Sequence, residues 1–327
     1  MIEVNSNQVS LSPRVSVIIP TYNRPEFVEK AIASVLDQTY QNLEVIVMQN
    51  GPSDVSAAVS EKFQKLGRPV RHVYLPKPCP VNARNEGVRV AKGELIAFLD
   101  DDDEWLPNKL AVQIDFYDKN PQFALVGCGV RIHDGKGNQL EAKNASVGGE
   151  FNIRKFLIRG GALHSLSCVL MRRKDFLLIG GFNPIYPISN DHDFYLRLLI
   201  ENRMWCLPDI LVSYRRHESN MTTDLTRAVD ENMQILRVAR RTIPYEKLKV
   251  SPRLFRVIEI KRSRIIANAG LDAYEAGDFK RSARYLGAAI RRDPLIGLKL
   301  KWGKRGPFLK RLIRPYAFFV KSAMKAA

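Results

Sequence analysis

The stretch V-S-V-I-I-P, residues 15–20, is a short, mostly apolar run rich in β-branched residues, and it ends in proline. Pro25 then opens a segment in which apolar residues recur along one helix face, so the sequence predicts a buried strand, a loop and an amphipathic helix. The same pattern repeats downstream, with strands expected at 43–48, 70–75 and 94–99, helices at 54–66 and 81–91, and Gly93 as a helix cap. Apolar strands that alternate with helices indicate an α/β fold with a mostly parallel sheet and helices on both faces.

The loops that follow these strands are expected to form a ligand site. In parallel sheets ligands gather at the carboxyl ends of the strands, and the loops that begin at Pro20, Gln49 and Asp100 all lie on that edge. Residues far apart in the sequence should therefore meet in one cleft. Beyond this part the pattern predicts further helices and strands, joined in one place by a hairpin turn: helices at 107–117 and 190–201, strands at 124–132, 167–171 and 210–214, and the turn D-G-K-G-N at 134–138.

The net charge of +17 is concentrated in the last third of the chain. Residues 221–327 contain 25 Lys+Arg against 9 Asp+Glu, whereas residues 1–220 contain 26 against 25. With a length of 327 residues and 45% apolar residues, this predicts a near-neutral globular domain followed by a basic, almost wholly helical segment, with a boundary near residue 220. The basic segment is expected to meet something anionic, either nucleic acid or an acidic membrane surface.

Composition argues against several classes of protein. No stretch approaches 18 consecutive apolar residues, and the first fifteen residues lack the basic start, apolar core and cleavage site of a secretion signal. We therefore expect the chain to be made and kept in the cytosol. The four cysteines, at 79, 128, 168 and 206, have no paired spacing, which argues against a disulfide framework and against a zinc site.

An acidic run follows the strand predicted at 94–99. The sequence continues directly into D-D-D-D-E, residues 100–104. Carboxylates crowded at the end of a buried strand repel each other unless they share a cation, and oxygen ligands suit Mg²⁺ or Mn²⁺. Because Mg²⁺ completes its shell with water and substrate phosphates, a diphosphate ligand is the next inference. The alternative is a solvated loop whose acids favour the start of the helix near Pro107.

Several motifs occur in a fixed order along the chain: V-S-V-I-I-P-T-Y-N-R (15–24), S-V-L-D-Q-T-Y (34–40), N-G-P-S-D (50–54), A-R-N-E-G-V (83–88), A-K-G-E-L-I-A-F-L-D-D-D-D (91–103) and G-G-F-N (180–183). In this order they resemble the family 2 glycosyltransferases, over roughly residues 12–220. The resemblance implies the GT-A fold and an inverting sugar transfer. It also implies a nucleotide-sugar-binding half at 12–115 and an acceptor-binding half at 116–220.

The resemblance implies a metal and donor site in the first half. The D-x-D element of the family falls on Asp100 and Asp102; both are implied metal ligands, with Asp102 as the principal one, and Asp100 or Asp101 is implied to bind the ribose of the donor. A bound Mn²⁺ or Mg²⁺ would neutralise the departing diphosphate. Donor binding is also implied for the first loop and for one helix: Pro20, Thr21, Tyr22, Asn23, Arg84 and Asn85. For Tyr22 the alternative is packing beneath the loop.

The turn after the second strand departs from the family pattern. Many members have two aspartates where this chain has Gln49 and Asn50, and the second often accepts a hydrogen bond from uracil. The carbonyl of Asn50 still accepts, while its amide also donates. The resemblance therefore implies UDP as the default nucleotide, with Asn50 in the donor site, and leaves other nucleoside diphosphates open.

The general base of the inverting reaction is implied at Asp191, where the family has a Glu-Asp element at the start of a helix. The hydroxyl of an acceptor is a weak nucleophile at neutral pH, so a carboxylate must remove its proton. Asn190 replaces the usual Glu and is expected to contact the acceptor, and Asp193 is either an acceptor-binding or a structural acid. The alternative for Asn190 or Asp191 is a helix N-cap.

Four basic positions complete the predicted site. His217 stands where some relatives place a histidine near the metal or diphosphate, so it is implied as a third metal ligand, with a purely structural histidine as the alternative. Arg215 and Arg216 are candidates for contact with the diphosphate. His164 lies in the acceptor half and is expected to contact the acceptor, unless it is an ordinary polar loop residue.

The basic segment contains two further patterns. Residues 270–294 resemble a single tetratricopeptide helix pair, which cannot form a solenoid alone and should pack on the catalytic domain or a partner. Residues 298–325 alternate basic and apolar side chains, which suits a helix lying on anionic lipid. An ordinary solvated face is the alternative, and no recognition motif supports nucleic acid.

Together these features predict a metal-dependent, inverting glycosyltransferase that uses a nucleotide-diphosphate sugar. The expected acceptor is a sugar or lipid-linked glycan of bacterial-type cell-surface polysaccharide or glycolipid synthesis, at the inner face of the cell membrane. The alternative is a non-catalytic nucleotide-sugar-binding or scaffold subunit that acts through its helical tail, which the residues at Gln49, Asn50 and Asn190 motivate. Binding of nucleic acid by the tail ranks last.

Overall fold

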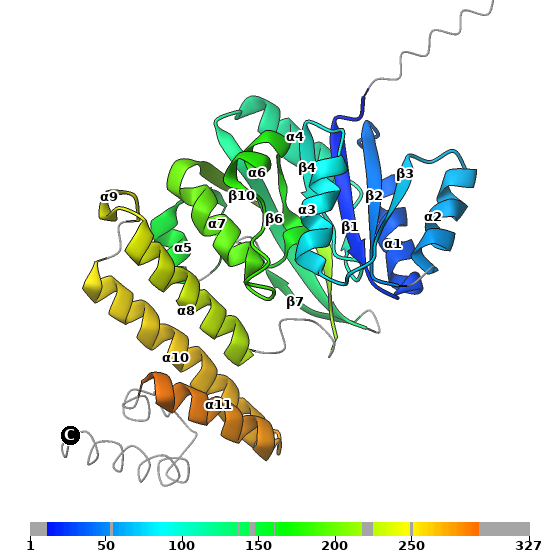
Figure 1. Ribbon diagram of the computed structural model, residues 1–327. Helices are drawn as coiled ribbons and strands as arrows, with labels where there is room; N and C mark the ends of the chain where they lie inside the picture. The colour runs from blue at the N-terminus through cyan, green and yellow to red at the C-terminus, as the bar shows by residue number, and fades with distance from the viewer. Residues whose placement is uncertain are drawn as a thin grey trace, which may run out of the picture. The chain divides into compact units, whose positions relative to one another are not determined.

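The structure is a computed structural model that describes residues 12–52, 55–135, 138–143, 148–159, 161, 163–217, 225–248 and 251–293. The chain divides into two compact units, Met1–Asn220 and Met221–Ala327 (Figure 1). The division falls where the sequence changes from near-neutral to basic.

The first half of the first unit alternates strands and helices, as the apolar periodicity predicts. Its elements are β1 (Val15–Thr21), α1 (Pro25–Leu36), β2 (Leu43–Asn50), α2 (Val55–Lys65), β3 (Val70–Leu75), α3 (Pro80–Val90) and β4 (Leu95–Phe98). Every residue of β1 and β2 is buried. β1 pairs in parallel with β2 and β4, and β3 continues the sheet beyond β2. The carboxyl ends of these strands therefore share one edge of the sheet.

The second half of this unit adds strands of both directions. Its elements are β5 (Glu104–Trp105), α4 (Lys109–Lys119), β6 (Phe123–Asp134), β7 (Gln139–Lys143), β8 (Gly149–Phe151), α5 (Ile153–Arg159), the 3₁₀ turn η1 (Leu166–Cys168), β9 (Leu170–Arg172), α6 (Arg173–Ile179), α7 (Asn190–Glu201) and β10 (Arg203–Arg216). The strand order is β3-β2-β1-β4-β9-β6-β10-β5. β9 runs antiparallel between β4 and β6, whereas β6 and β10 pair in parallel. Because β9 is reversed, the residues that precede it lie at the carboxyl end of β4.

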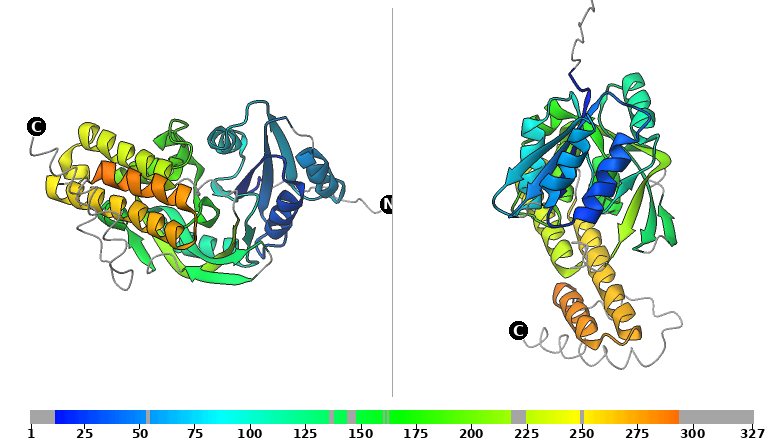
Figure 2. Two further views of the ribbon diagram at one scale, coloured as in Figure 1. Left: turned by 90° about the horizontal axis from the view of Figure 1, so that it is seen from below. Right: turned by 90° about the vertical axis from the view of Figure 1, so that its right-hand side faces the viewer.

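Helices cover both faces of the sheet, as predicted (Figure 2). On one face, α1 and α4 contribute Ala31 and Leu110 to the apolar cluster that includes Val17 of β1. On the other face α3 lies so close to β1 that a Cβ atom at Gly87 would be 2.5 Å from a methyl group of Ile18. Phe98 of β4 contacts the aromatic rings of α6 and of the segment after it. The mostly parallel central sheet with two helical layers is thus confirmed.

Three details differ from the sequence prediction. The strand expected at 167–171 begins as the turn η1, and only Leu170–Arg172 pairs as β9. The strand expected at 210–214 is the end of a longer strand, β10. The prediction that Gly93 caps a helix is wrong, because α3 ends at Val90 and its C-cap is Ala91. Gly93 instead donates its N–H to the hydroxyl of Ser16 at 2.8 Å. Gly93 is needed there because a Cβ atom would lie 2.6 Å from the backbone nitrogen of Ser16.

The second unit is helical in its described residues. Its helices are α8 (Leu225–Thr242), α9 (Tyr245–Leu248), α10 (Pro252–Glu275) and α11 (Phe279–Arg292). α10 and α11 form the predicted helix pair: Gly277 turns the chain with a φ of 79°, and the close approach of Gly270 to Leu286 leaves no room for a Cβ atom. None of the helices in the described ranges is both long and apolar enough to cross a membrane. The basic and apolar stretch at 298–325 lies outside the described residues.

Candidate active site

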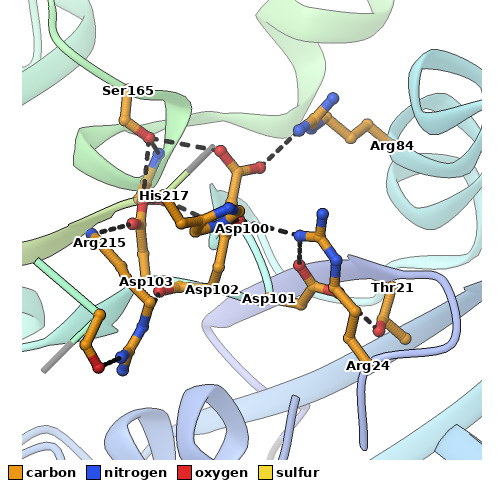
Figure 3. A network of polar contacts seen from close by, with 12 residues as sticks. Thr21, Arg24, Arg84, Asp100, Asp101, Asp102, Asp103, Ser165, Arg215 and His217 are labelled. Atoms are coloured by element: carbon orange, nitrogen blue, oxygen red, sulfur yellow. Dashed lines mark hydrogen bonds and ion pairs between the residues drawn. The ribbon is translucent and has the colours of Figure 1, made fainter. Parts of the chain in front are cut away.

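The acidic loop after β4, Asp100 to Asp103, contacts side chains from the end of β1, from the residue before α1 and from the residue after β10 (Figure 3). Asp101 accepts a hydrogen bond from the hydroxyl of Thr21 at 2.8 Å. The guanidinium of Arg24 bridges two acids, at 3.2 Å from Asp101 and 2.9 Å from Asp102. Asp102 also contacts Nε2 of His217 at 2.8 Å. Burial and the neighbouring charge of Asp102 raise the pKa of Asp101 to about 6, although Thr21 and Arg24 act against the increase.

Asp103 is the buried residue of this loop and stabilises it through hydrogen bonds. It is 1% exposed, and it accepts hydrogen bonds from the hydroxyl of Ser167 at 2.7 Å and from the backbone N–H of Arg215 at 3.1 Å. Burial, and then the charge of Asp100, raise the pKa of Asp103 well above its ordinary value. Ser165 lies between Asp100 and Asp103, at 3.4 and 3.3 Å. Asp103 is therefore a structural acid, while the three preceding aspartates line the edge of the sheet.

A second carboxylate, that of Asp191, belongs to the same charge network. Arg84 of α3 forms an ion pair with Asp100, and the charges of Arg84 and Asp100 both act on Asp191. Burial raises the pKa of Asp191 to about 6, and Arg84 lowers it. The backbone N–H of His192 donates to Asp191 at 2.7 Å, and no side chain among the described residues donates to it. A carboxylate with this pKa, with no side-chain donor and beside the acidic loop, is suited to accept a proton.

The end of β2 and the turn after it lie at the same edge of the sheet as the acidic loop. The side-chain oxygen of Asn50 accepts the backbone N–H of Cys79, the residue before α3. Gln49 is buried and accepts hydrogen bonds from Ser56 and His72. Gln49 and Asn50, the two positions that depart from the family pattern, therefore stabilise the turn through internal hydrogen bonds.

Tyr22 packs over this turn. Gly51 has a φ of +114°, and a Cβ atom there would lie 2.7 Å from the ring of Tyr22. The ring is nevertheless 49% exposed. One side of the ring thus packs on the turn, and the remaining surface faces solvent where a base can stack.

The sequence of this chain matches the model of a known protein family. The model of glycosyl transferase family 2 matches residues 16–178, which include the acidic loop and the turn after β2. The chain belongs to this family. The predicted membership is thereby confirmed.

Curated relatives of this family 2 member include proteins of known and unknown role. An uncharacterized glycosyltransferase of Rickettsia conorii is 32% identical over 62% of this chain and 34% of its own length. The putative teichuronic acid biosynthesis glycosyltransferase TuaG of Bacillus subtilis is 33% identical over 38% and 50%, respectively. A GalNAc(5)-diNAcBac-PP-undecaprenol beta-1,3-glucosyltransferase of Campylobacter jejuni is 30% identical over 45% and 48%. The chain thus spans about a third to a half of the length of these relatives.

Solved structures share the fold of this family 2 member. The S. aureus TarS fragment 1–349 in complex with UDP-GlcNAc has a TM-score of 0.55 at 17% identity, over 85% of this chain and 92% of that one. The mannosyltransferase PcManGT from Pyrobaculum calidifontis, in complex with GDP-Man and Mn²⁺, has a TM-score of 0.58 at 17% identity, over 87% and 88%. At this identity the likeness concerns the fold alone, which is of the GT-A type.

Two residues predicted to bind substrate have structural partners in this family 2 chain. Asn85 exchanges a pair of 2.9 Å hydrogen bonds with the backbone of Phe182, which occupies its amide. Asp193 is buried and accepts two hydrogen bonds from Arg197, which also donates to the backbone of Gly181. For Asp193 this geometry favours the structural alternative. For Asn85 it favours a role in joining α3 to the segment before α7.

The start of α7 settles the capping alternative. The N-cap is Ser189, so Asn190 and Asp191 lie inside the first turn. Asn190 donates to the carbonyl of Pro187 at 3.1 Å, and its buried side-chain oxygen has no hydrogen-bond partner among the residues that the structure describes. An unpaired buried acceptor is costly, so this oxygen is available to a hydroxyl donor. Contact of Asn190 with an acceptor stays a prediction.

The predicted histidines lie in different surroundings. The ring of His217 stacks on Phe27 with centroids 6.1 Å apart, and the guanidinium of Arg215 lies 5.3 Å from the centroid of the Phe27 ring. His164 is exposed and meets Tyr214 edge to face, with centroids 4.8 Å apart. His217 therefore contacts the acidic loop through Asp102. Contact of His164 with an acceptor stays a prediction.

The residues at the loop fit a divalent cation at one point. Among the described residues no group of three or more His, Cys, Asp or Glu side chains is arranged to hold a metal ion. Asp102 and His217 nevertheless form a close pair, and the Arg24 guanidinium already acts as a shared cation for Asp101 and Asp102. A carboxylate with an imidazole suits Mn²⁺. Asp100, the other predicted ligand, contacts Arg84 and Ser165 instead.

Sequence reasoning missed three residues that organise this site. Arg24 follows the predicted first loop directly, and the need for a cation beside four aspartates was a signal that could have identified it. Ser165 and Ser167 gave no such signal, because they reach the acids only through the reversed direction of β9.

Proposed function

We propose that the protein transfers a sugar from a nucleoside-diphosphate sugar to a hydroxyl group of a glycan acceptor, with inversion at the anomeric carbon. The observation that carries the proposal is the network that joins Asp191 to Arg84 and Asp100 at the carboxyl end of β4. It combines a proton acceptor with the cations and carboxylates that a donor diphosphate and ribose require.

On the donor side, the nucleotide lies across the edge formed by β1, β2 and β4. The exposed ring of Tyr22 stacks on the base, and the amide of Asn50 faces it, with UDP as the default nucleotide. Asp100 and Asp101 accept the ribose hydroxyls, and Arg84 meets the diphosphate. When bound at Asp102 and His217, Mn²⁺ or Mg²⁺ would neutralise charge on the leaving diphosphate.

On the acceptor side, Asp191 removes the proton of the attacking hydroxyl. At pH 7 a carboxylate with a pKa of about 6 is mostly ionised and still basic enough to take a proton. The acceptor oxygen forms a bond to the anomeric carbon as the bond to the diphosphate oxygen breaks, and the proton passes to Asp191. A single displacement of this kind inverts the anomeric configuration. Asn190 offers its unpaired oxygen to a second hydroxyl of the acceptor.

The product class we propose is a bacterial-type cell-surface polysaccharide or glycolipid, made at the inner face of the cell membrane. Two observations support it: the names of the relatives from Bacillus subtilis and Campylobacter jejuni, and the basic charge of residues 221–327.

A donor screen tests the proposal. Isothermal calorimetry of the full chain with UDP-, GDP- and dTDP-sugars, with and without Mn²⁺, should reveal one nucleotide whose binding requires the metal. Release of the nucleotide in the presence of an acceptor should follow for the same donor. If no donor binds, the transfer proposal fails and the non-catalytic scaffold becomes the better account.

A further inference from the structure

Asn50 ends β2, and the structure fixes which atom of its side chain can meet a nucleotide. The side chain contacts the backbone N–H of Cys79. A backbone N–H can only donate, so the atom that faces Cys79 is the carbonyl oxygen Oδ1. The other terminal atom of the side chain is therefore the amide nitrogen Nδ2, which also can only donate.

The amide of Asn50 is not used to hold the turn together. Across the ranges that the structure describes, no oxygen accepts a hydrogen bond from this amide. The neighbouring side chain of Gln49, by contrast, is engaged at both ends: its oxygen accepts from Ser56 and His72, and its nitrogen donates to the carbonyl of Gly51 at 3.2 Å. Of these two buried polar side chains, only Asn50 offers a group to a ligand, and that group is a donor.

The turn after β2 also has a surface on which a base can stack. The half-exposed ring of Tyr22 packs against Gly51, the residue that follows Asn50. A Cβ atom on Gly51 would lie 2.7 Å from this ring and 3.0 Å from Pro78, the residue before Cys79. A base that stacks on Tyr22 therefore lies beside this turn, where its hydrogen-bonding edge can reach the amide of Asn50.

We propose that Asn50 determines nucleotide specificity by donating a hydrogen bond to an acceptor atom of the base, so that a ring N–H of the base is not recognised. The inference rests on the proposed sugar transfer and concerns the nucleotide of its donor. Uracil and guanine carry an N–H on the ring nitrogen of their hydrogen-bonding edge, whereas cytosine and adenine carry a lone pair there. The amide can donate to that lone pair or to a carbonyl oxygen of uracil or guanine. CDP should therefore bind at least as tightly as UDP, and ADP at least as tightly as GDP.

Isothermal calorimetry of the full chain with UDP, CDP, GDP and ADP, in the presence of Mn²⁺, tests the inference. The variant is Asn50→Asp, which keeps the size of the side chain and an oxygen for Cys79 but replaces the amide by an acceptor. In this variant CDP should bind about tenfold to a hundredfold more weakly than UDP, because a carboxylate pairs with the ring N–H of uracil but repels the lone pair of cytosine. GDP and ADP should separate in the same direction.

The matched control is Asn82→Asp, at an exposed residue of α3 close in sequence to Cys79. It adds the same negative charge, which repels the diphosphate that all four nucleotides share. It should therefore weaken both members of a pair by the same factor and leave their ratio unchanged. Circular dichroism and the melting temperature verify that both variants fold.

Three results would overturn the inference while the proposed transfer survives. The first is a preference of the unchanged protein for UDP over CDP, or for GDP over ADP, of more than about tenfold, since the ring N–H would then be recognised. The second is an equal ratio in Asn50→Asp and in the unchanged protein. The third is the same change of ratio in Asn82→Asp, which would assign the effect to charge. If none of the four nucleotides binds, the transfer proposal fails, and the inference fails with it.

Discussion

The acidic loop and the start of α7 both place carboxylates at the same edge of the sheet, but they treat them differently. In the loop, Asp101 and Asp102 accept hydrogen bonds or ion pairs from the side chains of Thr21, Arg24 and His217. Within the described part of the chain Asp191 receives only backbone donors, although burial gives it the same pKa of about 6 as Asp101. The difference separates two tasks: paired carboxylates hold a position, and an unpaired one remains available for proton transfer.

The substitution Asp191→Asn should have the largest effect. The amide keeps the size of the side chain but cannot take a proton, so kcat should fall by about 10²- to 10⁴-fold while donor affinity stays unchanged. Nucleotide release measures kcat, and calorimetry measures the donor Kd. Asp37→Asn, at the exposed residue after α1, is the control. Normal turnover by Asp191→Asn would remove the base assignment.

Asp102→Ala should weaken donor binding, which Asp191→Asn is expected to leave unchanged. Loss of this carboxylate should weaken Mn²⁺-dependent donor binding roughly 100-fold, because charge-assisted contacts of this strength are lost. Donor Kd with and without Mn²⁺ is the measurement. An unchanged metal dependence would show that another group holds the cation.

The pH profile sharpens the distinction between the two acids. Because Asp191 must be ionised to act and its pKa is raised to about 6, kcat should rise with pH through about 6 and fall about tenfold per unit below it. Arg84→Gln removes a cation that lowers this pKa, so its profile should move to higher pH. The control is Arg89→Gln, an exposed arginine of the same helix. An Arg84→Gln profile that stays in place would separate Arg84 from the base.

The smallest expected effect concerns Arg24. Its guanidinium competes with a metal for Asp101 and Asp102, so Arg24→Gln should raise the Mn²⁺ affinity of the donor-free protein by about threefold to tenfold. Mn²⁺ titration monitored by electron paramagnetic resonance gives the Kd, with Lys30→Gln as control. A lower affinity in Arg24→Gln would mean that Arg24 supports the metal site instead.

The sequence predicted the parallel half of the fold well because its strands are long, apolar and separated by amphipathic helices. It missed β5 and β8, of two and three residues, and α5 and α6, of seven each. Elements this short do not complete enough of a period to be recognised. The reversal of β9 was likewise invisible, since it depends on pairing between segments more than 70 residues apart.

The candidate site shows the same limit. Asp100, Asp101 and Asp191 can be predicted as site residues because they follow a buried strand or lie at the start of a helix within recognisable motifs. The structural roles of Asn85 and Asp193 were not, because each depends on a partner that only the folded chain brings near. The side chain of Asn85 donates to the backbone of Phe182, 97 residues away. Arg197 donates both to Asp193 and to the backbone of Gly181.

These last contacts connect α3 to α7. Asn85 is the neighbour of Arg84 on α3, and Arg197 belongs to α7, whose first turn contains Asp191. Hydrogen bonds connect them through Phe182 and Gly181. A displacement of about 1 Å can cost about a hundredfold in rate, so in the proposed transfer these contacts would hold the leaving group and the base at a fixed spacing. In the proposed reaction, the distance between the leaving group and the base is thus set by contacts within the folded chain.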